Sequence, residues 1–173
     1  RELKYAIASV HETSKAAIDP DDARLWREKA DPYIPLSEGL CTDMAQECTS
    51  AAIQIFGGMG YVEETGVAQH YRNARILPIY EGTNGIQAAD LVGRKLGMRA
   101  GGVVFDALDR FATVADRLAS EDNMMTSAAN LPRAIDTCRH AISHLVQVAA
   151  NDSARPLAAS TPYMPLLVTT ACA

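Results

Sequence analysis

The apolar residues of this chain recur almost throughout with the period of an α-helix. Two of the clearest stripes consist of Val104, Leu108, Phe111, Ala115 and Leu118, and of Ile135, Cys138, Ile142, Leu145 and Ala149. No stretch alternates convincingly between apolar and polar residues, as a half-buried strand would. The sequence therefore predicts an all-α fold, built as a helical bundle that is followed by further C-terminal helices.

Capping residues and glycines mark the ends of the expected helices. Asp19 can cap a helix that starts at Pro20. A longer helix is expected over residues 37–56, with one apolar stripe facing the core and Gly57 after its last turn. That stripe consists of Leu40, Met44, Cys48, Ala52 and Ile55.

The middle of the chain predicts two further helices and a hinge. One helix covers residues 66–76. Asn84 is expected to cap the next helix, whose buried stripe consists of Ile86, Ala89, Val92 and Leu96. Residues 123–130 are polar, and they are interpreted as a hinge between the two C-terminal stripes.

The charge balance argues against a nucleic-acid partner. The 173 residues include 16 Lys and Arg against 21 Asp and Glu, a net charge of −5, and the basic residues are scattered. No apolar run approaches the roughly 18 residues of a membrane span, and no signal peptide opens the chain. We therefore expect a soluble, cytoplasmic protein with no membrane span. Because Arg1 opens what reads as mid-helix sequence, we also expect a fragment of a longer protein.

Cysteine and histidine residues give no sign of a metal site. The four cysteines, Cys41, Cys48, Cys138 and Cys172, lie among helix-forming residues without the two-residue spacing of a zinc or redox motif. They are interpreted as buried free thiols. His140 and His144 would share a helix face, but no third ligand accompanies them, so no metal is expected.

The least ordinary segment is Gln54-Ile55-Phe56-Gly57-Gly58-Met59-Gly60-Tyr61, followed further along by Tyr80-Glu81-Gly82-Thr83-Asn84-Gly85-Ile86-Gln87. Three glycines within four residues allow the backbone to come close to another molecule, and phosphate or ribose groups often bind beside such loops. The alternative is that the glycines only end a helix and form a turn. The residues alone leave both interpretations open.

Glu81 is the most informative single residue, because it stands between the apolar residues 76–80 and Gly82, just ahead of an expected helix. The positive end of a helix dipole favours an ionised carboxylate, whereas apolar neighbours raise the pKa of a carboxyl by desolvation. A general base requires such opposed effects. The alternative is an acidic residue that only decorates a helix N-terminus.

Three motifs together resemble the C-terminal helical domain of the acyl-CoA dehydrogenase family. They are the run at 54–61, the segment His70-Tyr71-Arg72-Asn73-Ala74-Arg75-Ile76, and the run at 80–87, in the family's order and spacing. The resemblance covers about residues 1–97 and extends less specifically to the remaining helices. The sequences of residues 63–66 and 84–95 are most similar to those of a subgroup with an added C-terminal helical domain. This subgroup includes bacterial 3-methylmercaptopropionyl-CoA dehydrogenases.

The resemblance implies a reaction and a role for each matching residue. Glu81 would be the base that removes the α-proton of a fatty acyl-CoA thioester while the β-hydride passes to FAD, giving a trans-2-enoyl-CoA. Gly82 would leave room for the thioester, and Tyr80 would line the acyl pocket. Cofactor contacts would come from Gln54, Ile55, Phe56, Gly57, Gly58, Thr83, Asn84 and Gly85. The family commonly has Gln where this chain has Gly85, which puts that contact in doubt.

The family's architecture implies further parts and partners. Residues 1–97 would form a partial acyl-CoA dehydrogenase C-terminal domain, and residues 98–173 an additional helical domain. An N-terminal helical domain and a middle β-domain would complete the enzyme, so the chain alone is expected to be inactive. The resemblance also implies a homodimer or homotetramer and an electron-transferring flavoprotein as electron acceptor. Two alternatives remain open, a non-catalytic helical oligomerisation module and an acyl-CoA oxidase.

Overall fold

The computed structural model describes residues 8–9, 12–16, 19–80, 82–120 and 124–172, and every regular element within these ranges is helical. The all-α prediction is confirmed. The α-helices are α2 (Pro20–Ala30), α3 (Tyr33–Phe56), α4 (Gly58–Tyr61), α5 (Val67–Arg75), α6 (Asn84–Asp90), α7 (Gly102–Leu118), α8 (Met125–Asn151) and α9 (Ser160–Cys172). Short 3₁₀ helices cover Glu63–Thr65 (η1), Met98–Gly101 (η3) and Arg155–Ala159 (η5), and a π-helix covers Leu91–Lys95 (η2).

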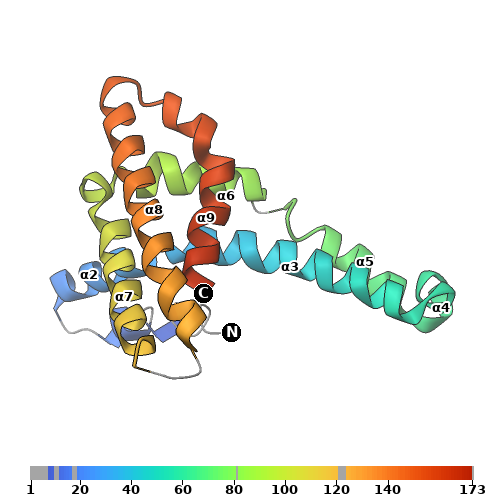
Figure 1. Ribbon diagram of the computed structural model, residues 1–173. Helices are drawn as coiled ribbons and strands as arrows, with labels where there is room; N and C mark the ends of the chain where they lie inside the picture. Colours follow the sequence, from blue (N-terminus) through green and yellow to red (C-terminus); the bar gives the residue numbers. More distant parts are fainter. Residues whose placement is uncertain (1–7, 10–11, 17–18, 81, 121–123, 173) are drawn as a thin grey trace.

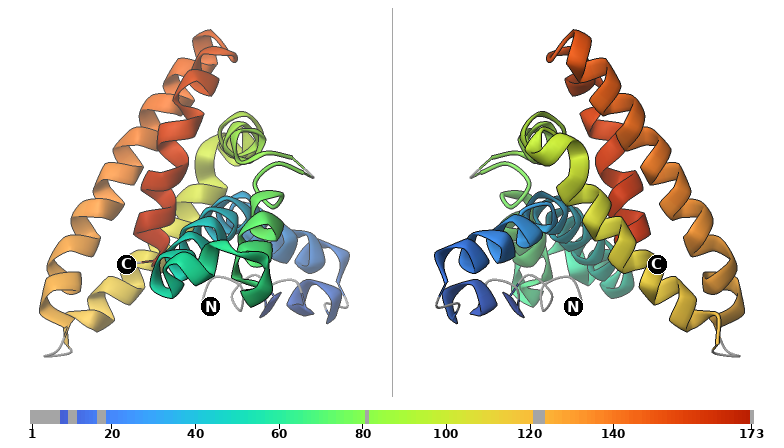
Figure 2. Two further views of the ribbon diagram at one scale, coloured as in Figure 1. Left: turned by 90° about the vertical axis from the view of Figure 1, so that its right-hand side faces the viewer. Right: turned by 90° about the vertical axis from the view of Figure 1, so that its left-hand side faces the viewer.

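The molecule divides into a bundle and an arm (Figure 1). The bundle contains α2, the first part of α3, α6, α7, α8 and α9. Helix α3 has 24 residues and is therefore about 36 Å long, so that its second part projects beyond the bundle. We call residues 44–75 the arm, because there α4 and α5 pack only along the projecting part of α3 (Figure 1). Figure 2 looks along the arm and shows α8 and α9 on one side of α3 and α2 on the other.

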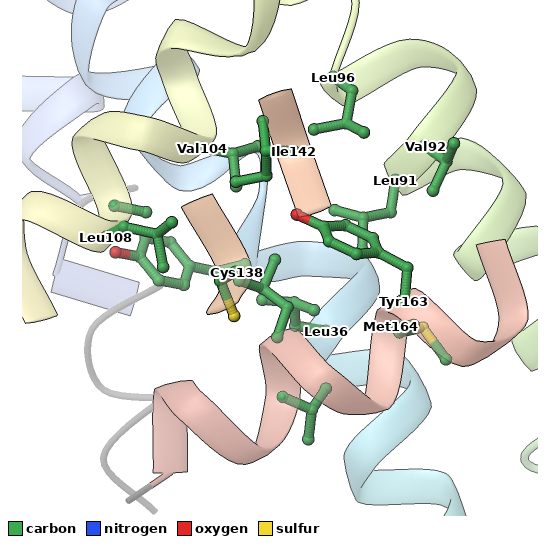
Figure 3. Close-up of a cluster of buried hydrophobic side chains, with 14 of the residues drawn as sticks. Leu36, Leu91, Val92, Leu96, Val104, Leu108, Cys138, Ile142, Tyr163 and Met164 are labelled. Atoms are coloured by element: carbon green, nitrogen blue, oxygen red, sulfur yellow. The ribbon is translucent and has the colours of Figure 1, made fainter. Parts of the chain in front are cut away.

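One hydrophobic core holds the bundle together (Figure 3). Leu91, Leu108 and Ile142 are completely buried in it, although they come from η2, α7 and α8. Helix α3 contributes Leu36, and α9 contributes Tyr163. Side chains from both sides of residue 97 thus share this core. The stripes predicted for α7 and α8 supply most of its C-terminal half, as expected from their period.

The apolar stripe predicted along α3 is wrong at three of its five members. Leu40 packs against the core, but Met44, Cys48 and Ile55 are exposed. The helix also begins at Tyr33 rather than at residue 37. Pro35 fits within its first turn, because backbone N–H groups there have no partner inside the helix. The stripe leaves the core because α3 is longer than the bundle that covers it.

Both the capping residue of helix α6 and its buried side differ from the prediction. Thr83, not Asn84, is its cap, since the Thr83 hydroxyl accepts a hydrogen bond from the Ile86 N–H at 3.3 Å. Ile86 is exposed, whereas Ala88 and Leu91 are buried. The π-helix η2 that continues α6 changes the helical register, and Val92 and Leu96 still reach the core.

Two further expectations change in the C-terminal half. Most of the predicted hinge is helical, because α8 begins at Met125; residue 123 lies outside the described residues. Among the cysteines, Cys138 alone is fully buried, and Cys48 and Cys172 are exposed. Burial raises the pKa of the Cys138 thiol, which lies 3.3 Å from the Thr170 hydroxyl. A buried thiol with a raised pKa is chemically inert.

A buried ion pair joins α2 to η2. The Lys95 side chain is 2% exposed, and its Nζ lies 2.9 Å from a carboxylate oxygen of Asp31, the residue after α2. Helix α2, which precedes Asp31, begins at Pro20 as predicted. The Asp19 carboxylate caps it by accepting a hydrogen bond from the Asp21 N–H at 2.8 Å. The ion pair between Asp31 and Lys95 therefore connects the end of α2 to η2, which continues α6.

Candidate functional site

One unusual motif lies at the far tip of the arm, and the other lies in the bundle near the base of the arm (Figure 1). The glycine-rich motif, residues 54–61, forms the far tip, where α3 ends and α4 begins. The second motif, residues 80–87, lies where α6 meets α3 near the bundle. Asp43, which contacts the second motif, precedes Gln54 by eleven residues, or about 16 Å of helical rise. The predicted cofactor-binding residues thus form two separate groups in this chain.

The glycines at the tip differ in what requires them. Gly60 is needed by packing, because a Cβ there would lie 2.5 Å from the Ile53 carbonyl oxygen. Gly57 ends α3 at φ 59° and donates its N–H to the Gln54 carbonyl at 3.1 Å. A Cβ on Gly57 or Gly58 would meet no atom within 4 Å. The backbone at these two positions is therefore open to another molecule.

The tip also exposes large apolar side chains. Ile55 is 82% exposed and Tyr61 is 80% exposed, while Phe56 and Met59 are more than half exposed. Exposed apolar side chains that lie together are typical of surfaces that meet another molecule. Next to it, the Arg72 guanidinium of α5 donates to both Glu63 oxygens at 2.8 and 2.7 Å. These hydrogen bonds lower the pKa of Glu63 and attach η1 to α5.

The second motif begins with a turn. Gly82 has a φ of 94°, a conformation that side chains rarely adopt, and Thr83 then caps α6. The backbone N–H of Asn84 donates to the Pro78 carbonyl at 3.4 Å, which joins the two ends of the segment 78–84. Tyr80 is about half exposed. Glu81, the predicted base, lies outside the described residues.

The Asn84 side chain is held by α3. Its Nδ2 atom donates to the Asp43 carboxylate at 2.7 Å and lies 3.5 Å from the Gly39 carbonyl oxygen. Its Oδ1 atom lies 3.0 Å from the Thr42 hydroxyl, which donates. The amide predicted to contact a cofactor thus has protein partners at both ends. By contrast, Gly85 is exposed, and a Cβ there would lie 3.6 Å from the Thr83 hydroxyl, an ordinary contact.

Thr42 and Asp43 are the residues that sequence reasoning missed at this place. Both lie on α3, 42 and 41 residues before Asn84. A buried threonine beside an acidic residue on a helix has no local signature of its own. Only the packing of α6 across α3 brings them to Asn84.

Comparison with known proteins identifies the family behind these motifs. Residues 16–97 match the family described as "Acyl-CoA dehydrogenase, C-terminal domain". The chain carries an acyl-CoA dehydrogenase C-terminal domain. The 3-methylmercaptopropionyl-CoA dehydrogenase of Ruegeria pomeroyi is 42% identical over 155 residues, which are 85% of this chain and 25% of that protein. The resemblance inferred from the motifs is confirmed.

Other acyl-CoA dehydrogenases are similar over shorter stretches. A butyryl-CoA dehydrogenase of Syntrophomonas wolfei is 34% identical over 122 residues, 70% of this chain and 19% of that protein. The mitochondrial short-chain specific acyl-CoA dehydrogenase of Sus scrofa is 41% identical over 91 residues, 46% of this chain and 22% of that protein. The chain therefore spans about a quarter or less of the length of these acyl-CoA dehydrogenases.

The described part of this acyl-CoA dehydrogenase domain and its C-terminal helices contains neither a membrane-spanning helix nor a cluster of metal ligands. Within the described ranges, no helix combines the length and the apolar character that crossing a membrane requires. Among the same residues, no three His, Cys, Asp or Glu side chains are grouped closely enough to hold a metal ion. His140 and His144 are both exposed on α8.

Proposed function

We propose that the protein carrying this chain catalyses the α,β-dehydrogenation of an acyl-CoA thioester to a trans-2-enoyl-CoA. The observation that carries the proposal is the segment from Tyr80 to Asn84, with Glu81 in sequence beside the left-handed Gly82, inside a domain that matches the acyl-CoA dehydrogenases. The names of the similar proteins, which include butyryl-CoA and short-chain acyl-CoA dehydrogenases, support the substrate class.

In this proposal, Glu81 removes the α-proton of the thioester. Such a proton is weakly acidic, so the negative charge that develops on the thioester oxygen requires hydrogen-bond donors in a site that excludes water. Gly82 has no side chain and leaves space beside the base for the thioester. The partly exposed ring of Tyr80 would cover one side of the acyl chain. FAD, when bound, supplies the hydride acceptor.

Most of the residues proposed to meet FAD are accessible, and Asn84 differs from them. At the tip, the backbone of Gly57 and Gly58 is open and the side chains of Ile55 and Phe56 are exposed, so a cofactor held by another subunit could approach them. Near α6, Thr83 and Gly85 are exposed, whereas the Asn84 amide already has partners in α3. Because these two groups are separate along α3, the tip would meet an FAD bound mainly by a partner subunit.

The remaining parts of the proposal concern organisation. Residues 1–97 would be a partial dehydrogenase C-terminal domain, and residues 98–173 an added helical domain that packs on it through the shared core. The assembled enzyme would be a homodimer or homotetramer and would pass electrons to an electron-transferring flavoprotein. The 173-residue chain alone is expected to be inactive and to purify without stoichiometric FAD.

The deciding experiment compares the full-length protein with its Glu81→Gln variant under anaerobic conditions. A panel of acyl-CoA thioesters of different lengths is added, and bleaching of the flavin absorbance is followed. The wild type should bleach with at least one thioester, and the variant should retain FAD but lose the bleaching, because it has no base. Absence of both FAD and bleaching in the wild type would contradict the proposal and favour a non-catalytic helical module.

A further inference from the structure

Asn84 connects three parts of the molecule. Its side chain contacts Asp43 and Thr42 of α3, and its backbone N–H donates to the carbonyl of Pro78. It is also the first residue of α6. The start of α6, the middle of α3 and the beginning of the segment 78–84 therefore meet at this one residue.

The hydrogen bonds fix the orientation of the Asn84 amide. A carboxylate can only accept, so the atom 2.7 Å from the Asp43 oxygen must be the amide nitrogen. The amide oxygen then faces the buried Thr42 hydroxyl at 3.0 Å, whose single hydrogen is shared between Asn84 and the Glu38 carbonyl oxygen at 2.7 Å. The bond to Asp43 is charge-assisted, and such bonds are stronger than those between neutral groups. The contact is therefore directional as well as close.

Next to Asn84, the chain contains a residue with high backbone freedom. Gly82 is the residue with the greatest backbone freedom, and it lies two residues before Asn84. The Thr83 hydroxyl accepts a hydrogen bond from the Ile86 N–H, so this side chain contacts α6 and does not fix the residues before it. The direction in which the chain leaves α6 toward Gly82 thus depends on how firmly Asn84 is attached to α3.

We infer that Asp43 and Thr42 are positioning residues, which act through Asn84 to fix the segment 78–84 relative to α3. This inference rests on the proposed function, because its consequence for catalysis requires that Glu81 in this segment be the base. It also gives Asn84 a different role from the cofactor contact that the family resemblance implies. A base displaced by about 1 Å can lose up to about 100-fold in rate.

The test uses the full-length protein with FAD bound and the variant Asp43→Ala. The matched control is Glu47→Ala, which removes an exposed carboxylate one turn further along α3; in the described part of the chain Glu47 makes no hydrogen bond through its side chain. The conservative variant is Asp43→Asn, whose amide oxygen can still accept from Asn84. For each protein, kcat, KM, the ratio of FAD to protein and the unfolding temperature are measured.

We expect Asp43→Ala to lower kcat by about 10- to 100-fold with KM and bound FAD close to those of Glu47→Ala. Asp43→Asn should recover most of the loss. Hydrogen–deuterium exchange supplies a readout that needs no turnover: Asp43→Ala should speed exchange in the peptide over residues 82–90 and leave α7 unchanged, and Glu47→Ala should do neither.

Two results would overturn the inference while leaving the proposed function intact. In the first, the wild type is active and Asp43→Ala matches Glu47→Ala in both kcat and exchange. In the second, exchange rises in Asp43→Ala but kcat stays unchanged, which would make the contact structural only. If the wild type oxidises no thioester, the proposed function fails, and the catalytic role inferred for Asp43 and Thr42 fails with it.

Discussion

The bundle and the arm bury their apolar residues to very different extents. In the bundle, side chains such as Leu108 and Ile142 are completely buried in a core to which several helices contribute. On the arm, Ile55 and Tyr61 are at least 80% exposed. Burial of apolar surface is the main favourable term in folding, so the bundle supplies most of this chain's stability. The arm instead presents apolar surface that is suited to meeting another molecule, and both unusual motifs lie on it or at its base.

The largest expected effect is a difference in the free energy of unfolding between a substitution in the core of the bundle and one at the tip of the arm. Leu108→Ala should lower the free energy of unfolding by about 3–4 kcal/mol, because it removes buried atoms and leaves a cavity. Ile55→Ala should change it by less than about 0.5 kcal/mol, since that side chain is already in solvent. Urea denaturation of the chain measures both. If Ile55→Ala cost as much as Leu108→Ala, the division into bundle and arm would be wrong.

The next effect concerns the buried ion pair of the bundle. Asp31→Ala leaves the ammonium group of Lys95 buried without its partner and should cost about 2 kcal/mol. This value is below that of a fully buried pair, because the Asp31 carboxylate is partly exposed. Lys95→Met removes the charge but keeps an apolar chain of similar length, so it should cost less than Asp31→Ala. The reverse order, measured by the same urea denaturation, would contradict the interpretation that the unpaired charge of Lys95 causes the loss.

The smallest effect concerns the ion pair of the arm, which is fully exposed to solvent. The Arg72 guanidinium lowers the pKa of Glu63, so this carboxylate stabilises the fold above the ordinary pKa of glutamate and loses that contribution as the pH falls through its lowered value. Between about pH 5 and pH 3, the unfolding temperature should therefore fall slightly more for the wild type than for Glu63→Gln. High salt should reduce the difference. A clear difference between the two proteins in how the unfolding temperature changes with pH above about pH 6 would contradict the assignment.

Local signals in the sequence were sufficient for much of the fold. The cap at Asp19, the helix near residues 66–76 and the stripes of α7 and α8 follow from hydrogen-bonding side chains and from helical period, which act over a few residues. The motifs at 54–61 and 80–87 were also enough to indicate the family, which the match at residues 16–97 confirms. The roles of Glu81 and of the cofactor-binding residues remain predictions.

Longer-range features were beyond the sequence. Met44 and Ile55 continue a good apolar stripe, yet they are exposed, because a stripe is buried only where other helices reach it. Cys48 and Cys172 lie in helices like Cys138, but only Cys138 faces the core. Periodicity specifies that a helix has an apolar side and does not specify how far along its length a partner extends.

The sequence by itself thus determined that this chain is helical, where α2 begins and α3 ends, and to which family its motifs belong, since each of these depends on neighbours in the chain. The tertiary structure alone decided that α3 extends beyond the bundle. It also decided that the Asn84 side chain contacts Asp43 and Thr42, which lie 41 and 42 residues away in sequence. The physical reason is that burial and side-chain contacts depend on which helices pack together, and no local pattern encodes that choice.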